Sequence, residues 1–323
     1  MKILHDIHTH NIFSSCCVDR GASTVAYLQK EAELGMRLFG LSNHIWDERV
    51  KGSSYWYRVQ TIAKAEEAKN AFSKAAPGLR VLFGAETEYY ACRDLLGMSV
   101  EGASHFDYLL VPHSHLHMRN EVMQDFPEVL EARAEVRRRL AKALPELTEA
   151  QIRSMADTLK ERDLQALLPA ERTEPHAFLV RCMTEGFLSL LENNDFRALC
   201  GRLPVSIAHP FAPCGVPHAE KNDYLRLLTN ESLQDCFTRA AALGVSIELN
   251  TGAIREVGAD LAHNEMIRIF SIAKACGCRF TFGTDSHSVQ GLEGIAFGNA
   301  IADALHLTRA DLAELVADAV EEA

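Results

Sequence analysis

Short apolar runs alternate with amphipathic segments along most of the 323 residues. The runs predict seven buried strands, at residues 2–7, 37–42, 79–84, 106–111, 203–208, 244–249 and 279–283. Several of the segments between them carry apolar residues at helical spacing. Strands that are separated by helices are typical of parallel β-α units, so the pattern predicts an α/β fold with a parallel sheet.

The intervening segments predict the helices that would cover this sheet. A helix capped by Ser23 or Thr24 is expected to end at Gly35. Its expected apolar stripe is Val25, Leu28 and Ala32. Further helices are expected at 58–75, 231–242 and 263–275, and two more after the last strand. The last of these begins at Thr308, and its expected inward face is Leu312, Leu315, Val316 and Ala319.

Residues 119–200 interrupt the alternation of strands and helices. Helical spacing appears at Val129, Ala132, Val136, Leu140 and Leu144, and a further helix is expected at 175–192. Residues 148–151 have the sequence of a capping box, which would open a helix with Ile152, Met155 and Leu159 on one face. So long a connection normally has a structure of its own. We therefore expect one barrel domain over residues 1–323 with a helical insertion at about 119–200, either a cap beside the site or an oligomer interface.

Composition restricts the class of protein. With 47% hydrophobic residues the chain can bury a large core, and a net charge of −11 argues against a nucleic-acid surface. Nine cysteines without a C-x-x-C pair indicate reduced thiols in a cytoplasmic protein. The sequence has no secretory signal pattern and no apolar run long enough to span a bilayer, so no membrane partner is expected.

Potential metal ligands follow nearly every predicted strand. They are His8 and His10, His44, Glu86, His115, His209, and finally Asp285 and His287. A single histidine at a strand end is usually structural, but eight such groups at the same ends of seven strands are not explained in that way. In barrels of parallel strands these ends form the active-site face. The spacing therefore predicts a polynuclear metal site in an α/β barrel.

The order of these motifs resembles the PHP family, named for polymerase and histidinol phosphatase. The matching motifs are H-x-H, S-N-H, G-A-E, S-H-L-H, A-H-P and the terminal G-T-D-S-H. The resemblance implies a distorted, TIM-like (β/α)7 barrel with a helical insertion after the fourth strand. It also implies two or three divalent transition-metal ions (Zn, Mn or Fe) and the hydrolysis of phosphate monoesters of small metabolites.

The resemblance further implies a ligand set. His8, His10, Glu86 and Asp285 would hold one ion; Glu86 would bridge to a second held by His115 and His209; His44 and His287 would serve a third. Where many relatives have a histidine or an acid after the H-x-H loop, this chain has Cys16, with Asp19 nearby, and their D-H is Asn43-His44. A thiolate from Cys16 would favour zinc, and the alternative is an empty third site. His115 fits the family pattern better than His113, which stays the other candidate.

Catalysis would use water activated by the ions, with a basic side chain at the substrate phosphate. Arg255 is the candidate for that cation and Arg20 the reserve, although a surface ion pair is an equally good role for either. His287 or His218 would protonate the leaving group. The expected partner is a small phosphorylated substrate. The alternatives are an amidohydrolase-type metal-dependent hydrolase, which also begins with H-x-H, and a non-catalytic regulatory barrel of the same family.

Overall fold

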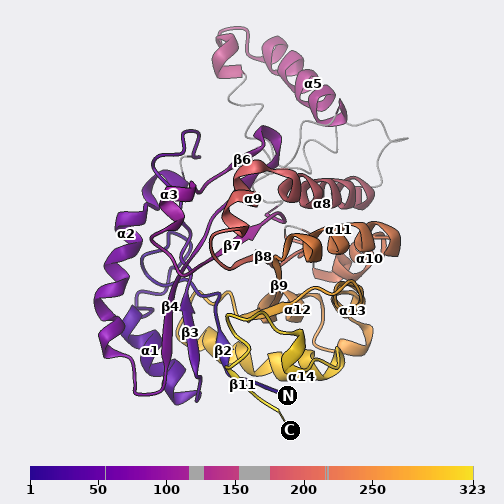
Figure 1. The fold of residues 1–323 in the computed structure, drawn as a ribbon. Coiled ribbons are helices and arrows are strands. Elements are labelled where there is room, and N and C mark those ends of the chain that lie inside the picture. Colours follow the sequence, from indigo (N-terminus) through magenta and orange to yellow (C-terminus); the bar gives the residue numbers. More distant parts are fainter. Residues whose placement is uncertain (55, 116–126, 153–174, 215, 217, 323) are drawn as a thin grey trace.

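The computed structural model describes residues 1–54, 56–115, 127–152, 175–214, 216 and 218–322. Seven parallel strands form one sheet in the order β10-β9-β8-β7-β4-β3-β2 (Figure 1). Their bounds are β2 (His5–Asp6), β3 (Leu38–Leu41), β4 (Arg80–Glu86), β7 (Tyr108–Pro112), β8 (Val205–Ala208), β9 (Ser246–Asn250) and β10 (Phe280–Gly283). Each of them overlaps or adjoins a strand expected from the sequence.

The two edge strands of this sheet, β2 and β10, lie against each other, so the sheet nearly closes. The N–H of Ile7 donates to the carbonyl of Phe282 at 3.2 Å, and the N–H of Asp285 donates to the carbonyl of His8 at 2.8 Å. Further along, Thr9 and Ser286 form a parallel bridge. The fold is therefore the expected TIM-like α/β barrel, and all its strands end at one face.

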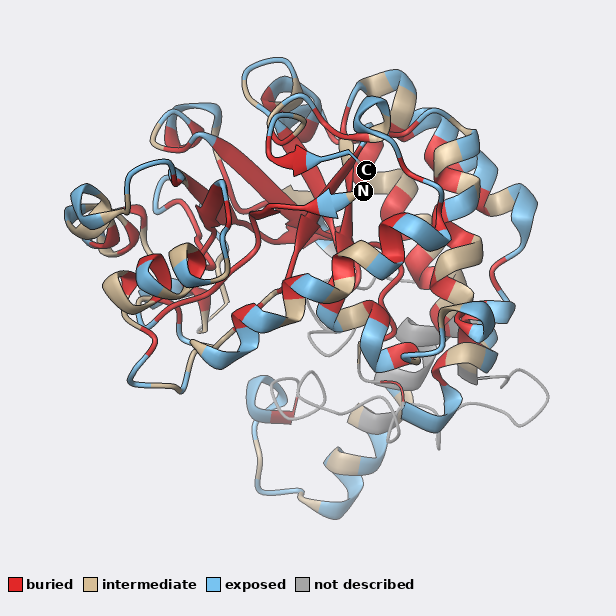
Figure 2. Cartoon of the chain, turned by 90° about the horizontal axis from the view of Figure 1, so that it is seen from below, coloured by how far each residue is buried: buried red, intermediate tan, exposed pale blue. Residues whose placement is uncertain are grey.

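Helices surround the barrel and bury their inner sides. Figure 2 shows buried strands at the centre and, around them, helices that alternate between buried and exposed residues. The helices are α1 (Thr24–Glu33), α2 (Ile62–Glu66), α3 (Val100–Ala103), α10 (Lys221–Arg226), α11 (Asn230–Leu243), α12 (Thr251–Val257), α13 (Glu265–Ala275) and α14 (Phe297–Ala304). The helix expected at 58–75 is divided into α2 and the 3-10 segments Tyr57–Val59 and Glu67–Lys74. Other 3-10 segments are Ala91–Arg93, His218–Glu220, Leu261–His263 and Gln290–Ala296, and β5 (Tyr89–Tyr90) and β6 (Leu95–Leu96) form a hairpin.

The first helix is capped as expected but buries a different face. The hydroxyl of Ser23 accepts from the N–H of Ala26 at 3.2 Å, which satisfies one of the free N–H groups at the start of α1. The buried residues of α1 are Thr24, Tyr27, Leu28 and Glu31. Val25 and Ala32 are only half-buried. The stripe shifts because the hydroxyl of Tyr27 donates to the carbonyl of His10 at 2.8 Å and so draws that side of the helix inward.

Three helices are described in the region of the expected insertion: α5 (Pro127–Ala143), α8 (Pro175–Glu192) and α9 (Asn194–Cys200). The capping box is present, since Thr148 and Gln151 each accept from the other's N–H. Helix α8 packs against α10 and α11, whereas Figure 1 shows α5 standing apart beyond α8. Met155 and Leu159 lie outside the described residues. The insertion and its role as a cap or an interface stay predictions.

The last expected helix is wrong. After Thr308 there is only the 3-10 turn Arg309–Asp311, with Thr308 and Asp311 forming a capping box. The chain then crosses the amino-terminal end of β10, where the N–H of Ala313 donates to the carbonyl of Phe280 at 2.9 Å. It ends in β11 (Val320–Glu321), which pairs antiparallel with β1 (Lys2–Ile3). Contacts with the sheet thus replace the helical hydrogen bonds, although Leu312, Val316 and Ala319 are buried as expected.

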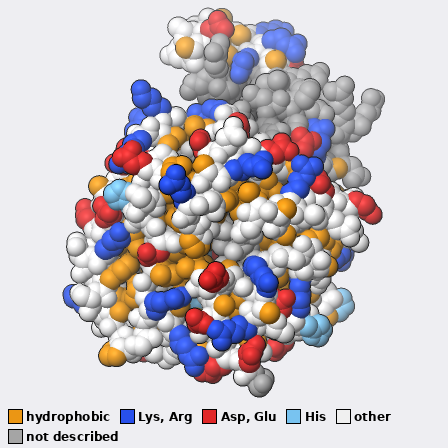
Figure 3. Space-filling model, in the orientation of Figure 1, with side chains coloured by type: hydrophobic (Ala, Val, Ile, Leu, Met, Phe, Trp, Pro, Cys, Tyr) orange, Lys and Arg blue, Asp and Glu red, His pale blue; other side chains and the backbone are white. Residues whose placement is uncertain are grey.

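The exposed surface is mixed in character. On the face shown in Figure 3, Lys and Arg side chains are interspersed with Asp and Glu. The large hydrophobic residues that are exposed are Ile12, Val18, Val59, Val100 and Leu227, among those described. In the described part of the chain, no helix combines the length and apolarity that crossing a bilayer requires.

A tyrosine crosses the barrel interior beneath the strand ends. Tyr108 on β7 donates its hydroxyl to the carbonyl of Ile7 at 2.6 Å, and its ring passes over Gly84 on β4 and Gly40 on β3. A Cβ atom on Gly84 would lie 2.2 Å from the Tyr108 ring, and one on Gly40 would lie 2.3 Å from the hydroxyl oxygen. Both glycines are therefore needed for the ring to reach across three strands.

Replacing Gly84 by alanine should destabilise the fold by about 1–3 kcal/mol, the usual cost of overpacking a core. The matched control is Gly186→Ala within α8, where a Cβ would meet nothing nearer than the carbonyl oxygen of His113 at 3.9 Å. Because glycine disfavours a helix interior, that variant should gain about 0.5–1 kcal/mol. Chemical denaturation of both variants measures the difference, and equal stabilities would contradict this packing.

Candidate metal centre

The nine side chains that were predicted as metal ligands lie together at the carboxyl ends of the strands. Their donor atoms form four overlapping groups, within each of which all donors lie within 4.8 Å of one another. The groups are His8, His10 and Glu86; Glu86, His115 and His209; His8, His209 and Asp285; and His10, Cys16, His44 and His287. The structure therefore brings together residues from both ends of the sequence, and their role as ligands stays a prediction.

Glu86 lies at the centre of the cluster, and its two carboxylate oxygens face different imidazoles. Its Oε2 is 3.2 Å from His10 Nε2 and 3.1 Å from His44 Nδ1. Its Oε1 is 3.1 Å from His209 Nε2 and 3.7 Å from His115 Nε2. This arrangement suits a carboxylate that is shared between two ions.

His8 and His10 follow β2 in extended chain and point to the same side, as the alternation of side chains predicts. Their Nε2 atoms are 3.0 Å apart, and Asp285 Oδ1 is 3.1 Å from His10 Nε2. Asp285 and His209 have φ angles of 54° and 30°, in the left-handed region that non-glycine residues seldom adopt. Such backbone conformations cost free energy and occur mostly at functional sites.

The charges of the cluster indicate a site for cations. Four carboxylates contact its imidazoles, Glu86 and Asp285 within the cluster and Glu88 and Glu248 beside it. Within the described ranges all the ion pairs of these four are with histidines. Burial would raise the pKa of Glu86, but His44 and His8 hold that pKa well below its usual range. Burial opposes ionisation of Asp285 too, yet His8 and His10 lower its pKa. Several buried carboxylates without lysine or arginine partners are costly unless cations neutralise them.

Two of these carboxylates, Glu248 and Glu88, were not predicted from the sequence. Glu248 on β9 lies 2.7 Å from His8 Nδ1 through Oε1, and its Oε2 accepts from the N–H of His209 at 2.6 Å. Carboxylates of this kind fix the ring orientation of metal-binding histidines. A charged residue inside an apolar strand was the available signal for Glu248.

Glu88 connects two histidines through a tyrosine. Its Oε2 is 2.7 Å from His115 Nδ1 and accepts from the hydroxyl of Tyr57 at 3.1 Å. The Tyr57 oxygen is also 3.2 Å from His44 Nδ1. Glu88 therefore orients His115 directly and is linked to His44 through Tyr57.

Replacing Glu88 by glutamine should lower the affinity for the ion beside His115 by about 10–100-fold, because outer partners of metal ligands have effects of that size. Dialysis against graded concentrations of chelator, followed by elemental analysis, measures the affinity. The matched control is Glu256→Gln: this carboxylate lines the same cavity but pairs with Lys221. Equal metal retention in the two variants would contradict the role of Glu88.

The structure places His113 outside the cluster. Its ring packs edge-on against Phe187 and Phe211, with centroid distances of 4.9 and 5.0 Å. Neither ring nitrogen has a hydrogen-bond partner, and burial lowers the pKa of His113 to about 3. This arrangement favours His115 of the two candidates.

Two further sequence features have local explanations. Asn43 stands where the family has aspartate, and its side-chain oxygen and nitrogen each bond to Asn11 at 2.9 Å, which anchors the loop that carries Cys16. Asp19, the neighbouring candidate, accepts from the N–H of Gly21 at 2.8 Å and thus closes its own turn. Cys16 belongs to one of the four groups, and burial raises the pKa of its thiol to about 12.

Of the residues proposed for catalysis, the structure brings only His287 to the cluster. Arg255 lies with its guanidinium 4.9 Å from the centre of the Phe297 ring and does not line the cavity described below. Arg20 and His218 are exposed and also lie outside its lining. The phosphate-binding role expected of Arg255 therefore finds no support in the geometry, because stacking on Phe297 holds its charge elsewhere.

A cavity of about 790 Å³ opens over the cluster. Its walls include Trp56 and Tyr57, Cys214 and Ala253, and its floor is formed by Glu86 and other residues of the cluster. The lining contains no lysine or arginine among the residues that the structure describes. The cavity has the size of a small-molecule site, and both apolar and polar residues line it.

The fold, but not the sequence, has a recognisable counterpart among known proteins. No protein-family model and no curated protein matches the sequence. Among solved structures, the histidinol phosphate phosphatase of Lactococcus lactis subsp. lactis Il1403, complexed with zinc, L-histidinol and phosphate, matches with a TM-score of 0.52. The two chains share 13% sequence identity, and the match covers 98% of each. At this identity the likeness concerns the fold alone.

Proposed function

We propose that this protein is a metal-dependent phosphoesterase of the PHP family, which hydrolyses phosphate monoesters of small metabolites in the manner of a histidinol phosphatase. The observation that carries the proposal is the position of Glu86, whose two oxygens face His10 and His44 on one side and His115 and His209 on the other. The likeness of fold to a phosphatase that was complexed with zinc and phosphate supports it.

The residues present fit divalent ions. His8, His10, Glu86 and Asp285 would hold one, and Glu86, His115 and His209 a second; both sets combine imidazole with carboxylate, as zinc, manganese and iron accept. The buried carboxylates need such cations, because their ion pairs within the described residues are with histidines alone. When bound, a pair of ions would activate water and neutralise the phosphate.

The chain's own residues position these groups and shape the space for the substrate. Glu248 and Glu88 hold the rings of His8 and His115 in fixed orientations. The cavity is lined by Trp56 and by small residues such as Ala212, Gly252 and Ala253, which leave room for an organic leaving group. Since the described lining has no lysine or arginine, the phosphate charge depends on cations held by the cluster.

A screen of the metal-loaded protein tests the function. We expect release of phosphate from monoesters, with histidinol phosphate and nucleotides among the substrates assayed. Amides and carboxylic esters belong in the same screen, because hydrolysis of those substrates alone would identify an amidohydrolase-type enzyme instead. A protein that carries its ions and hydrolyses none of these compounds would leave the regulatory barrel as the better account.

A further inference from the structure

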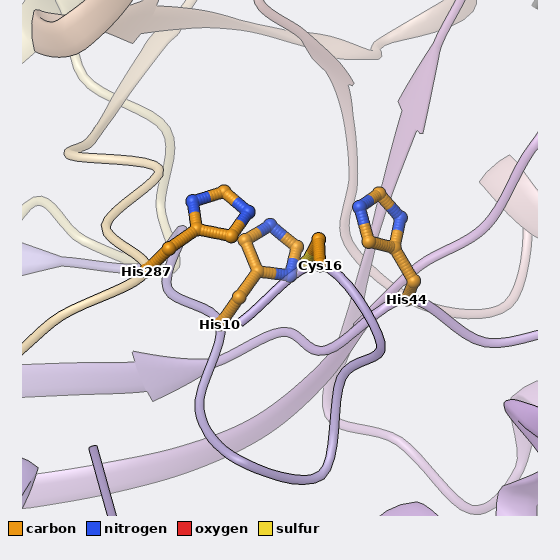
Figure 4. Close-up of side chains that lie close together, drawn as sticks. All are labelled: His10, Cys16, His44 and His287. Carbon is orange, nitrogen blue, oxygen red and sulfur yellow. The ribbon is translucent and has the colours of Figure 1, made fainter. Parts of the chain in front are cut away.

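One of the four donor groups differs from the others in its chemistry. Cys16, His44, His287 and His10 bring one thiol sulfur and three imidazoles within 4.8 Å of one another. They come from the segments that follow β2, β3 and β10, and Figure 4 shows them gathered around a common space. Each of the other three groups contains a carboxylate, whereas this group has none.

The imidazole of His10 gives a second, independent indication of a ligand here. Its Nε2 is already within 3.2 Å of Glu86 and 3.1 Å of Asp285, but its Nδ1 is buried without a hydrogen-bond partner. The ring lies 4.5 Å from that of His44 and 4.7 Å from that of His287, and is stacked on both. A buried nitrogen without a partner is uncommon and indicates that a further group occupies the space beside His10.

The position of Cys16 is fixed relative to His44 by one serine. Ser14 Oγ is 3.1 Å from Cys16 Sγ and accepts from the N–H of His44 at 3.3 Å. The same hydroxyl donates to the side-chain oxygen of Gln60 at 3.2 Å, so Ser14 is itself held in place. The sulfur forms no disulfide and lines the cavity, where an ion can reach it.

We propose that Cys16, His44 and His287 form a mixed sulfur–nitrogen site beside His10, and that this site prefers zinc to manganese or magnesium. Thiolate and imidazole are good ligands for zinc, whereas manganese and magnesium favour oxygen donors. The proposal rests on the phosphoesterase function above and deepens it, because one ion would differ in kind from those bound through Glu86. It assigns His287 to ion binding rather than to protonation of the leaving group.

Cobalt(II) tests the sulfur ligand directly, because thiolate bound to cobalt gives an intense charge-transfer absorption that nitrogen and oxygen ligands do not give. Chelator-treated protein would be titrated with cobalt. We expect the band in the wild type and in Cys214→Ser, a thiol of the same cavity that belongs to none of the four groups. The band should be absent from Cys16→Ser. Its absence from the wild type, or its survival in Cys16→Ser, would overturn the proposal.

Metal content provides the second measurement. After equilibration with zinc, the wild type should hold one more ion per chain than Cys16→Ser, whereas equilibration with manganese should leave the two equal. Cys16→His, which restores a nitrogen donor, should recover the zinc content without the cobalt band, and it serves if Cys16→Ser does not fold. Equal zinc contents in the wild type and Cys16→Ser would reject the site.

A phosphatase assay with p-nitrophenyl phosphate separates this proposal from the function on which it rests. Activity of the wild type without the cobalt band would reject the sulfur ligand and retain the phosphoesterase. The band without activity toward this compound or any phosphate monoester of the screen would retain the sulfur site and reject the phosphoesterase.

Discussion

Replacing Glu86 by glutamine should lower kcat/KM for a phosphate monoester by more than about 100-fold, the upper end of the effect of losing an outer partner of a metal ligand. The loss should be larger than that because Glu86 faces two sets of imidazoles at once. Glutamine lacks the negative charge that would bind the ions. Its NH₂ group would replace one of the two carboxylate oxygens and would therefore face the imidazoles or the ion next to that oxygen. Steady-state kinetics with metal supplied in excess measures the effect.

Cys16→Ser is the informative comparison for Glu86→Gln. Cys16 belongs to one donor group only, whereas Glu86 belongs to two. We therefore expect Glu86→Gln to cost more activity than Cys16→Ser. Circular dichroism would first establish that both variants are folded. Comparable losses in the two would place Cys16 in the core of the site and overturn the assignment of Glu86 as the shared ligand.

Removing the ions should abolish activity and lower the thermal stability of the protein. We expect the purified protein to carry at least two transition-metal ions per chain, because eight predicted ligands lie at the strand ends in addition to Cys16. A ligand present at a hundred times its Kd stabilises the folded state by about 2.7 kcal/mol, so the melting temperature should fall on chelation and recover on reloading. Elemental analysis that finds one ion or none, after purification without chelators and with metal supplied, would contradict this prediction.

Binding of inorganic phosphate provides a second measurement of what removing the ions does to the site. The cavity presents Glu86, Glu256 and Asp285, with no lysine or arginine in its described lining. Inorganic phosphate should therefore bind to the loaded protein and not to the chelated one, as titration calorimetry can measure. Binding that persists after chelation would show that another cation holds the phosphate.

The strands were predictable because each carries its own signal. Buried parallel strands are continuous apolar runs, and their carboxyl ends meet at one face whatever the details of packing. This is why His44 and Glu86, far from His209 in sequence, could be expected beside it. The last helix was wrong for the opposite reason: the apolar spacing after Thr308 is the same whether the segment forms a helix or crosses β10. Its conformation depends on hydrogen bonds to Phe280, Leu4 and β1, which lie far away in the sequence.

Residues that act on other side chains were harder to predict than those at the strand ends. Glu248 lies two residues before the end of β9, and its carboxylate contacts His8. This contact joins the sixth strand of the barrel to the segment after the first strand, and no local pattern in the sequence records it. Arg255 lies in α12 with its guanidinium over Phe297 and outside the cavity lining, because a position in the sequence does not fix the direction of a long side chain. Packing in three dimensions decides such cases.

The seam between β2 and β10 has a consequence for the order of events during biosynthesis. His8 and His10 leave the ribosome long before Asp285, whose Oδ1 lies 3.1 Å from His10 Nε2 in the folded protein. The nascent chain therefore cannot assemble the complete donor set until β10 has emerged and the sheet has closed. Ion uptake by the finished site must follow, rather than direct, the folding of the earlier strands.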